Sequence, residues 1–588
     1  MQLTEEDVVT AAEPVADHTP DGRGAGIAVS SALLLAACGG GGGSPSSNNP
    51  PPTVPPPPPP PVRKAATDVE AARFLHQAQF SSPDADIASL KTDGYLAWLN
   101  ARYNAAPGQT GVAWLNSRNH NSITIEQRYF WPQFGDWMIW NQLLDGPDEM
   151  RKRIALALSE FFVVSLSPID GFYPPYVIGA YWDLLTTNAF GNFRTLLEKI
   201  TLNAGMGFFL NTKGNLKEDA NGRQPDENYA REVMQLFTIG LYELNPDGTH
   251  KLGSNNQPIE TYGQSDITNL ARVFTGYDWD YSRVTWTNVA WHDYDVPSTE
   301  FATDPMRFRA QDHSTLEVNF LGTNIPANTP GPEALRIALD RLFNHANAGP
   351  FFARQMIQRL VTSNPSPAYV GRVAAAFADN GSGVRGDLRA VWTAILMDDE
   401  ARNAPAPSDT LSGKLREPVV RFVQWARTVG NHSENGAWEI YDLSPSDQAL
   451  GQSALRSPSV FNFFRPGYVP PSTAIADAGK QAPEFQLLNE TTTAGYINFM
   501  QWMTRWGYND VKPTYNYLQT IAQDVPAVVS WLNLKLAAGQ LSTDTLAVLQ
   551  AVGAAFNITA TSTFDQRLDM VATLAFLVMI SPDYLVQK

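Results

Sequence analysis

A proline-rich stretch at residues 50–61 divides this chain into a leader and a body. Ten of its twelve residues are proline, and Thr53 and Val54 are the exceptions. Proline lacks a backbone N–H and has a fixed φ, so the stretch can join neither a helix nor a central strand and forms an extended polyproline II rod. With the flexible glycines at 39–43 it makes a predicted tether over residues 38–64. The folded body is therefore expected at residues 65–588.

The segment before the tether has the features of an export signal. Residues 27–37 are apolar, too few to cross a bilayer, which takes about 20 residues, but enough for the core of a signal peptide. The run ends in LAAC, which resembles a bacterial lipobox, and Cys38 is the only cysteine of the chain. We predict a signal leader over residues 1–37 and lipidation of Cys38. The alternative is a chance apolar run with an idle buried cysteine, and only Arg23 supplies the basic residue that normally introduces a signal.

This prediction places the protein in the cell envelope, anchored to a membrane by lipid and facing the periplasm or the cell exterior. Gly39 follows the cysteine, where an Asp would signal retention at the inner membrane, so the outer membrane is favoured.

The formal net charge of −17 narrows the range of partners. Binding to nucleic acid without sequence preference needs clustered positive charge, so we expect no nucleic-acid partner. A single cysteine excludes a disulfide framework and a cysteine-rich zinc module. At 43% hydrophobic residues, the body can bury a large core.

Helical periodicity dominates the body. Asn380-Gly381 is a natural helix end, and the next helical pattern begins shortly after it, which predicts a helical hairpin. Ser562 and Asp565 form a capping-box-like start for the last helix. We expect a mostly α fold, a large multi-helix single domain. The apolar stripes that predict its clearest helices lie at residues 150–161, 230–241, 370–377, 388–396 and 564–580.

Strand signals are sparse. Turn sequences at residues 245–248 and 254–258 predict a small β-hairpin between residues 244 and 262. Residues 277–320 are rich in aromatic side chains and show no clear period, so we expect an irregular, aromatic-rich insertion at the surface. No repeat of fixed length is present, which argues against a solenoid.

Several motifs resemble the bacterial family DUF1800. The most distinctive is DENYAREVMQLFTIG at residues 226–240. The others, in chain order, are ARFLHQAQF at 72–80, ARVFTGY at 271–277, LREP at 415–418, SPSVFNFFRP at 457–466 and SPDYLVQ at 581–587. The resemblance covers about residues 65–588.

The resemblance implies an exported protein but names no reaction. Members of the family are commonly encoded beside DUF1501, a sulfatase-like family, so a DUF1501-type protein is an expected partner. Two positions depart from the family pattern: Asp226 stands where Asn is usual, and Val318 stands where Lys is usual.

The distinctive motif carries the first candidate site. Glu227 and Arg231 are four residues apart on a predicted helix and can pair, and Glu232 lies on a neighbouring face. Two carboxylates near one Arg could act as acid and base, because the Arg lowers one pKa while burial raises the other. The alternative is a structural ion network in which Arg231 fixes one helix against another.

The insertion carries the second candidate site. Trp279, Trp291 and Tyr294, interleaved with carboxylates, suit sugar binding by stacking and hydrogen bonding. His292, Asp293 and His313 suit a divalent metal, although the spacing is not that of a known metal motif. The third interpretation is an acidic, solvated loop anchored by its aromatic residues.

Motifs of several enzyme classes are missing from the sequence: it has no Gly-x-Ser-x-Gly elbow and no phosphate loop. Our leading hypothesis is therefore a non-catalytic binding or scaffold protein of the envelope, acting with a protein partner or a polymer. The alternatives are a carboxylate-dependent hydrolase of an envelope or extracellular glycan, using Glu227, Glu232 and Asp293, and a metal-dependent enzyme centred on His292 and His313. No cofactor is predicted, although a divalent metal fits the third hypothesis.

Overall fold

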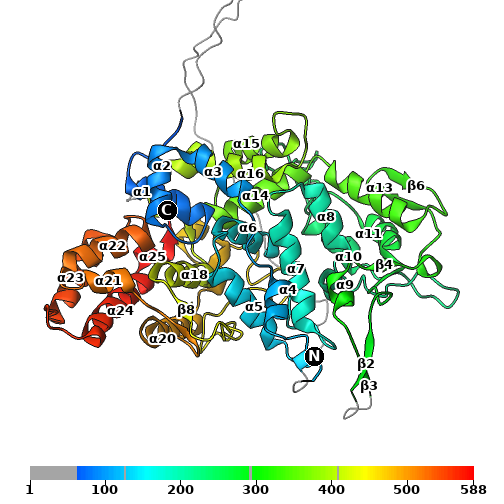
Figure 1. Cartoon of the computed structure of the whole chain (residues 1–588). Helices are drawn as coiled ribbons and strands as arrows, with labels where there is room; N and C mark the ends of the chain where they lie inside the picture. The colour runs from blue at the N-terminus through cyan, green and yellow to red at the C-terminus, as the bar shows by residue number, and fades with distance from the viewer. Residues whose placement is uncertain (1–61, 125–127, 290–293, 407–408) are drawn as a thin grey trace, which may run out of the picture. The chain divides into compact units, whose positions relative to one another are not determined.

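A computed structural model describes residues 62–124, 128–289, 294–406 and 409–588. The leader, Cys38 and the tether up to residue 61 lie outside the described residues, as do Trp291, His292 and Asp293. The described part falls within one compact unit, Pro61–Lys588. It is mostly α-helical, as predicted, and its strands occur only in short two-stranded pairs (Figure 1).

The first group of helices surrounds α7 (Pro174–Asn188), which is the centre of the body. Pro174 and Pro175 begin α7 at the positions where a missing N–H costs nothing. Its residues Val177, Tyr181 and Trp182 are fully buried because neighbouring helices cover it on several sides. These neighbours and the helices before them are α1 (Asp68–Ala78), α2 (Asp84–Thr92), α3 (Tyr95–Asn104), α4 (Gly111–Ser117), α5 (Gln133–Leu144), α6 (Glu149–Ser159), α8 (Phe193–Thr201) and α9 (Ala204–Phe209).

The second group of helices includes the predicted helical hairpin, α15 (Pro367–Ala378) packed on α16 (Leu388–Met397). Gly381 has φ of +88° at the turn between them, as a left-handed helix end requires. The remaining helices of this group are α10 (Asn228–Gln235), α11 (Gln264–Ala271), α12 (Glu300–Thr303), α13 (Gly331–Phe343), α14 (Ala348–Leu360) and α17 (Asp399–Arg402).

The C-terminal group packs around α24 (Phe564–Ile580), whose bounds match the prediction. Its capping box lies one residue later than expected: the Thr563 backbone N donates to Gln566 Oε1 (2.8 Å), and Gln566 N donates to Thr563 Oγ1 (3.2 Å). The other helices are α18 (Pro418–Val429), α19 (Ala474–Asp477), α20 (Glu490–Trp506), α21 (Asn516–Thr520), α22 (Val525–Ala537), α23 (Thr543–Ala555) and α25 (Pro582–Leu585).

Helix α10 is shorter than its apolar stripe predicts. The stripe runs to Leu241, but the helix ends at Gln235 and Leu241 is 49% exposed. The backbone N–H groups of Ile239 and Gly240 both donate to the carbonyl of Met234, at 2.9 and 3.0 Å, and Gly240 has φ of +72°. These bonds close the helix early and turn the chain away from the core.

Short strands occur in the segment 277–320, for which we predicted irregular structure. The hairpin predicted at 244–262 is a meander of single bridges, Tyr242 to Glu260, Leu244 to His250 and Leu252 to Pro258. The aromatic-rich insertion contains a regular hairpin that projects from the body in Figure 1. The antiparallel pairs are β1 (Tyr277–Asp278) with β4 (Arg307–Phe308), β2 (Trp286–Val289) with β3 (Tyr294–Pro297), β5 (Val318–Phe320) with β6 (Thr323–Ile325), β7 (Lys414–Leu415) with β10 (Val586–Gln587), and β8 (His432–Ser433) with β9 (Val511–Lys512).

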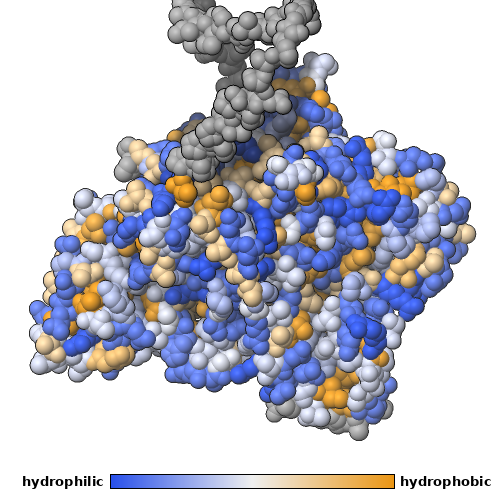
Figure 2. Space-filling model, turned by 45° about the horizontal axis from the view of Figure 1, so that its top comes forward, coloured by the Kyte–Doolittle hydropathy of each residue, from blue (hydrophilic) through white to orange (hydrophobic). Residues whose placement is uncertain are grey.

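The face of the protein in Figure 2 is mainly hydrophilic. On the face that Figure 2 shows, hydrophobic side chains occur in small separate groups among polar ones. No helix within the described ranges is both long enough and apolar enough to span a bilayer.

Candidate functional site

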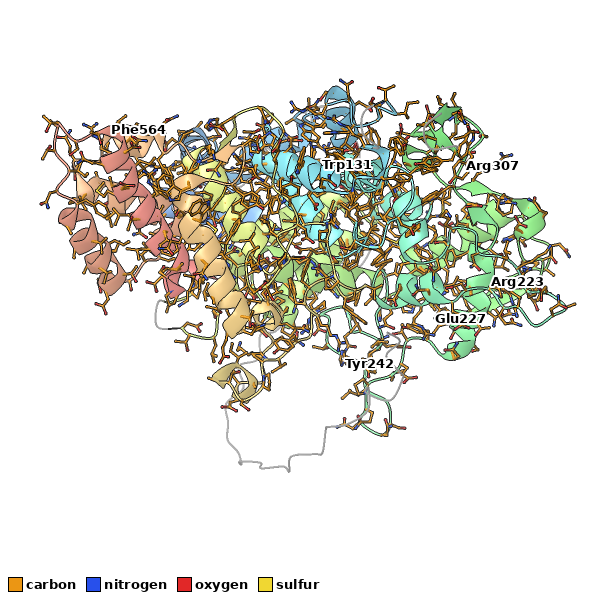
Figure 3. The ribbon with its side chains drawn as sticks, turned by 90° about the horizontal axis from the view of Figure 1, so that it is seen from below. Trp131, Arg223, Glu227, Tyr242, Arg307 and Phe564 are labelled. Atoms are coloured by element: carbon orange, nitrogen blue, oxygen red, sulfur yellow. The ribbon has the colours of Figure 1, made fainter. Side chains whose placement is uncertain are left out.

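Glu227 joins α10 to α11. It precedes the first residue of α10, and its Oε1 accepts a hydrogen bond from Thr268 Oγ1 (2.7 Å). Its Oε2 accepts from Gln264 Nε2 (2.8 Å) and lies 3.4 Å from Arg231 Nη2. The predicted pair of Glu227 and Arg231 is therefore present, and Glu227 lies near the edge of the body in Figure 3. The Glu227 carboxylate also accepts hydrogen bonds from Gln264 and Thr268 of α11.

Glu232 has a different environment. It is 6% exposed, and its Oε2 has no hydrogen-bond partner among the residues that the structure describes. Burial raises the pKa of Glu232 to about 7, against the opposing effect of the Arg231 charge. Glu227 and Arg231 remain partly exposed, so the motif places one carboxylate at the surface and the other inside. An acid–base role for these residues stays a prediction.

Trp279, predicted to bind sugar, lies in the core. It is 9% exposed, and its Nε1 donates to the carbonyl of Ala204 (3.0 Å). Lys213 Nζ lies 4.5 Å from the ring centroid, and Phe208 stacks on the ring at 5.9 Å. Tyr294 packs against Phe130 at 6.1 Å between ring centroids. Trp279 is therefore buried and Tyr294 is partly buried, and Trp291 lies outside the described residues.

His313, predicted as a metal ligand, is a core residue. It is 6% exposed, and its Nδ1 lies 2.9 Å from the carbonyl O and 3.1 Å from Oγ1 of Thr275. Burial lowers the pKa of His313, against the opposing effect of its hydrogen bond to the Thr275 backbone. Across the described ranges, no group of three or more His, Cys, Asp or Glu side chains could hold a metal ion. The metal hypothesis thus depends on His292 and Asp293, which are not among those residues.

A stack of aromatic rings, which we call the aromatic ladder, leads from Trp279 to the surface. Its members are Trp279, Phe301, Tyr281 and Trp286. Phe301 lies 5.1 Å from Trp279 and 5.3 Å from Tyr281, and Tyr281 lies 5.7 Å from Trp286, between ring centroids. The last two pairs are stacked, and Trp286 is 50% exposed. The accessible stacking surface is therefore at Tyr281 and Trp286, not at the predicted Trp279.

An open cavity of about 580 Å³, the α7–α8 cavity, lies where α4, α7, α8 and the end of α12 meet. The Asp183 carboxylate at its wall accepts hydrogen bonds from the backbone N–H groups of Gly111 (2.6 Å) and Val112 (2.9 Å). Burial raises the pKa of Asp183 to about 6. The polar side chains that line the cavity are Asp183, Thr187, Asn188, Glu198, Lys199, Asn203, Thr303 and Asp304.

The α7–α8 cavity and the aromatic ladder are linked through one ion pair. Arg283 Nε donates to the Asp304 carboxylate at 2.9 Å. Asp304 lines the cavity, and Arg283 lies between Tyr281 and Trp286 in the chain. Inside the cavity, Lys199 Nζ donates to Asn188 Oδ1 at 2.9 Å. No sequence motif marks the cavity, because its walls come from four segments that share none.

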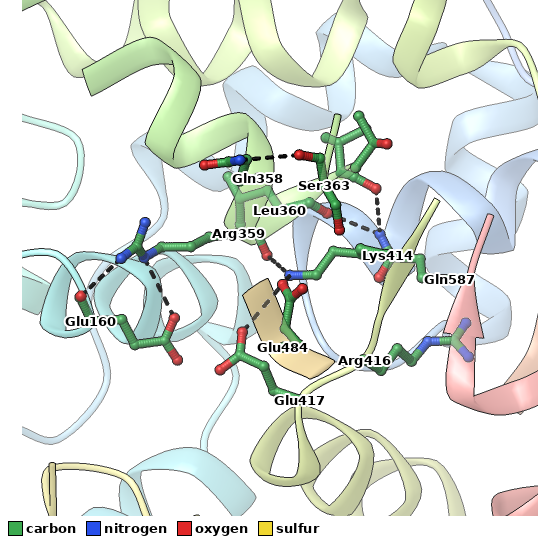
Figure 4. Close-up of polar contacts among 12 residues, drawn as sticks. Glu160, Gln358, Arg359, Leu360, Ser363, Lys414, Arg416, Glu417, Glu484 and Gln587 are labelled. Atoms are coloured by element: carbon green, nitrogen blue, oxygen red, sulfur yellow. Dashed lines mark hydrogen bonds and ion pairs between the residues drawn. The ribbon is translucent and has the colours of Figure 1, made fainter. Parts of the chain in front are cut away.

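A second feature without a sequence signal is a buried ionic cluster of Arg153, Glu160, Arg359, Lys414, Glu417 and Glu484. Figure 4 labels its members other than Arg153. Lys414 Nζ lies 2.9 Å from Glu484 Oε1 and 3.8 Å from Glu417 Oε1. Arg359 Nε lies 3.7 Å from Glu160 Oε2. Each side chain in these three ion pairs is at most 6% exposed.

The carboxyl groups of Glu160 and Glu417 differ in the direction of their pKa shifts. Burial, and then the neighbouring charge of Glu417, raises the pKa of Glu160 well above its ordinary value. Burial acts against ionisation of Glu417 too, but Lys414 and Arg153 outweigh it and lower the pKa of that carboxyl. Glu160 is thus the protonated member of the pair and Glu417 the ionised one. Because the cluster is buried, we interpret it as a structural contact that holds α6, α14, β7 and the 3₁₀ turn at Pro483–Leu487 together.

Comparison with known proteins gives one match. The sequence model of a family described as "Protein of unknown function (DUF1800)" matches residues 73–586. No curated protein and no solved structure matches the chain.

Proposed function

Because the chain belongs to the DUF1800 family, whose function is unknown, we propose from its sequence and its geometry together that it is an exported, lipid-anchored binding protein of the cell envelope. The ligand we propose is a glycan or another polyhydroxylated molecule, held in the α7–α8 cavity. The observation that carries the proposal is the cavity itself: about 580 Å³, within the range of about 300–1,000 Å³ that is typical of ligand sites.

The lining of the cavity supports this ligand class. Apolar groups, among them Leu184 and Leu202, supply most of the surface that lines the cavity, and hydroxyl, amide, ammonium and carboxylate groups lie between them. Sugars offer both donors and acceptors, which such a mixed lining can satisfy. The exposed rings of Tyr281 and Trp286, joined to the cavity through Arg283 and Asp304, supply a stacking surface for a chain that extends beyond the cavity.

Export and anchoring are supported by sequence features alone: the LAAC motif with Cys38 and the tether that follows it. A lipid on Cys38, a flexible tether and a stiff proline rod would hold the body away from a membrane surface. A DUF1501-type protein stays the proposed partner, and co-purification from native envelopes tests it.

The binding proposal is tested with envelope polysaccharide and two variants. Thr187 is exposed within the cavity, so Thr187→Trp should occupy part of it and weaken binding without unfolding the body. Trp286→Ala should weaken binding by removing the outermost ring of the aromatic ladder. Trp502→Ala is the matched control, since Trp502 is 61% exposed on α20 and lines no part of the cavity. Equal binding by wild type and Thr187→Trp would refute the proposed site.

A second candidate function, hydrolysis of a glycan, is favoured by one observation. Glu232 combines a buried oxygen that has no hydrogen-bond partner among the described residues with a pKa raised to about 7, the range in which a general acid or base works. If this function is correct, the chain degrades an envelope glycan, and Glu232→Gln abolishes turnover while binding in the cavity is retained. If Glu232→Gln changes only stability, the group is structural.

A further inference from the structure

A smaller cavity of about 220 Å³ lies on another part of the body, between α14, the meander at residues 242–260 and the segments around Gly467 and Gln481. Its polar lining consists of Arg354, His250, Gln355, Gln358 and Gln481. None of its lining residues is Asp or Glu. The walls therefore supply positive charge and amide groups without a carboxylate to neutralise them.

Arg354 of α14 supplies the charge. Its Nη2 donates to Gln481 Oε1 at 3.1 Å, and it forms no ion pair with a carboxylate in the described part of the chain. Burial lowers the pKa of Arg354, and no acidic neighbour opposes that effect. A guanidinium carries five N–H donors in a planar fork, so most of them stay available to the cavity.

Two other arginines of this group of helices, Arg359 and Arg385, have more hydrogen-bond or ionic partners. Arg359, also on α14, pairs with Glu160. Arg385 has no acidic partner either, but it donates to the carbonyls of Phe343 (3.1 Å) and His345 (3.2 Å) and packs over two aromatic rings. Among the described residues, the Arg354 guanidinium donates only to the neutral side chain of Gln481, so it has neither the carboxylate of Arg359 nor the two carbonyls of Arg385.

The glutamines hold this arrangement in place. The backbone N of Gln481 donates to Asn364 Oδ1 (2.9 Å), and Asn364 Nδ2 donates back to the Gln481 carbonyl (2.7 Å). Gln481 Oε1 also accepts from Gln358 Nε2 (3.2 Å), so the oxygen that orients Arg354 is fixed from two sides. Gln355 Oε1 accepts from Arg359 Nη1 (2.7 Å), which leaves the Gln355 amide nitrogen as a further donor.

His250 adds a second basic group. Its ring packs against Tyr242 at 5.2 Å, and Tyr242 is labelled in Figure 3 near the lower edge of the body. Burial, followed by the charge of Arg354, lowers the pKa of His250. The two groups thus act on each other across the cavity, and an anion between them would favour the charged form of His250.

We propose that this cavity binds an oxyanion group, a carboxylate, sulfate or phosphate, with Arg354 as its counter-ion. The planar guanidinium can hold two oxygens of such a group at once, and the Gln355 amide and the His250 ring complete the set of donors. The volume suits one anionic group with a small part of the molecule that carries it. This site is independent of the α7–α8 cavity, so a ligand in one does not require a ligand in the other.

The test is calorimetric titration of the detergent-solubilised full chain with sodium sulfate, phosphate and acetate at constant ionic strength. Wild type should bind one or more of these anions saturably with one site, and the ranking identifies a dianion or a carboxylate as the preferred group. Arg354→Gln should weaken that binding at least tenfold, and Arg354→Lys should weaken it less, because Lys keeps the charge but not the fork. Arg307→Gln removes the same charge from an exposed position and should bind as wild type does.

A second measurement follows His250 directly by NMR in the wild-type protein. Addition of the best-binding anion should raise the pKa of His250, and this rise should be missing in Arg354→Gln. The proposal is overturned if none of the three anions binds saturably, or if Arg354→Gln binds as tightly as Arg307→Gln. It is also overturned if the His250 titration curve is the same with and without the anion.

Discussion

Replacement of Lys414 by Met tests the interpretation of the buried ionic cluster. Lys414 Nζ lies 2.9 Å from Glu484 Oε1 and 3.8 Å from Glu417 Oε1, and it donates to the carbonyl of Arg359 at 2.7 Å. The three side chains of these ion pairs are at most 2% exposed. Met has a similar length and preserves the packing, so the main loss is electrostatic: two buried carboxyls lose their nearest cation.

The expected cost is large. Breaking a buried ion pair by removing one partner destabilises a protein by about 3–5 kcal/mol, because an uncompensated charge stays behind. The loss should shrink at acidic pH, since protonation of Glu417 and Glu484 removes the uncompensated charge. Burial already raises the pKa of Glu484, so this relief begins above the ordinary carboxyl range.

The assay is urea unfolding followed by circular dichroism, at pH 7.5 and again at pH 5. Lys91→Met is the matched control: Lys91 pairs with Asp68 at 2.7 Å, but both side chains are more than 40% exposed. Such a surface pair contributes about 0–1 kcal/mol. If the two variants lose the same stability at pH 7.5, or if Lys414→Met is equally destabilised at both pH values, the interpretation of the cluster is wrong.

Three further predictions concern other parts of the chain. The pKa of Glu232 is about 7 in the folded state against 4.5 ordinarily, so its contribution to stability is complete below about pH 4.5 and is lost as the pH rises through 7. Glu232→Gln should therefore be more stable than wild type at pH 8, by at most about 3 kcal/mol, and close to it at pH 4.5, as measured by urea unfolding. At Gly240, φ is +72° and an added Cβ would lie 2.8 Å from Phe351 Cε2. Gly240→Ala should lower the free energy of unfolding by more than the roughly 1–2 kcal/mol that the left-handed conformation alone costs. Gly381→Ala is the control and should lose only that amount, because no atom lies within 4 Å of its added Cβ. Equal losses of thermal stability in the two variants would contradict the clash with Phe351. Cys38→Ser should abolish incorporation of radiolabelled palmitate, and unchanged labelling would refute lipidation at that residue.

Local features of the fold could be predicted from sequence. The last helix and the α15–α16 hairpin were predicted because their apolar spacing and their end signals lie within the same 10–20 residues. The Glu227–Arg231 pair was predictable for the same reason, since four residues on a helix bring two side chains together. The early end of α10 could not be predicted in this way, because it depends on backbone hydrogen bonds around Gly240 and the apolar stripe carries no information about them.

Features that depend on distant segments could not be predicted. The ionic cluster joins Glu160, Arg359, Lys414 and Glu484, which come from parts of the chain at least 50 residues apart. Lys414 lies only three residues before Glu417, but the sequence does not show that Glu160, Arg359 and Glu484 join them. The burial of Trp279 and the lack of an acidic partner for Arg354 are likewise properties of the packed body.

The central claim, a ligand in the α7–α8 cavity, is tested most directly by hydrogen–deuterium exchange of the full chain with and without the polysaccharide fraction of the native envelope. Peptides that cover residues 180–203 and 299–306 should exchange more slowly when the ligand is present, and peptides of α20 should not change. Slower exchange confined to other segments, or no change at a saturating concentration, would contradict the account.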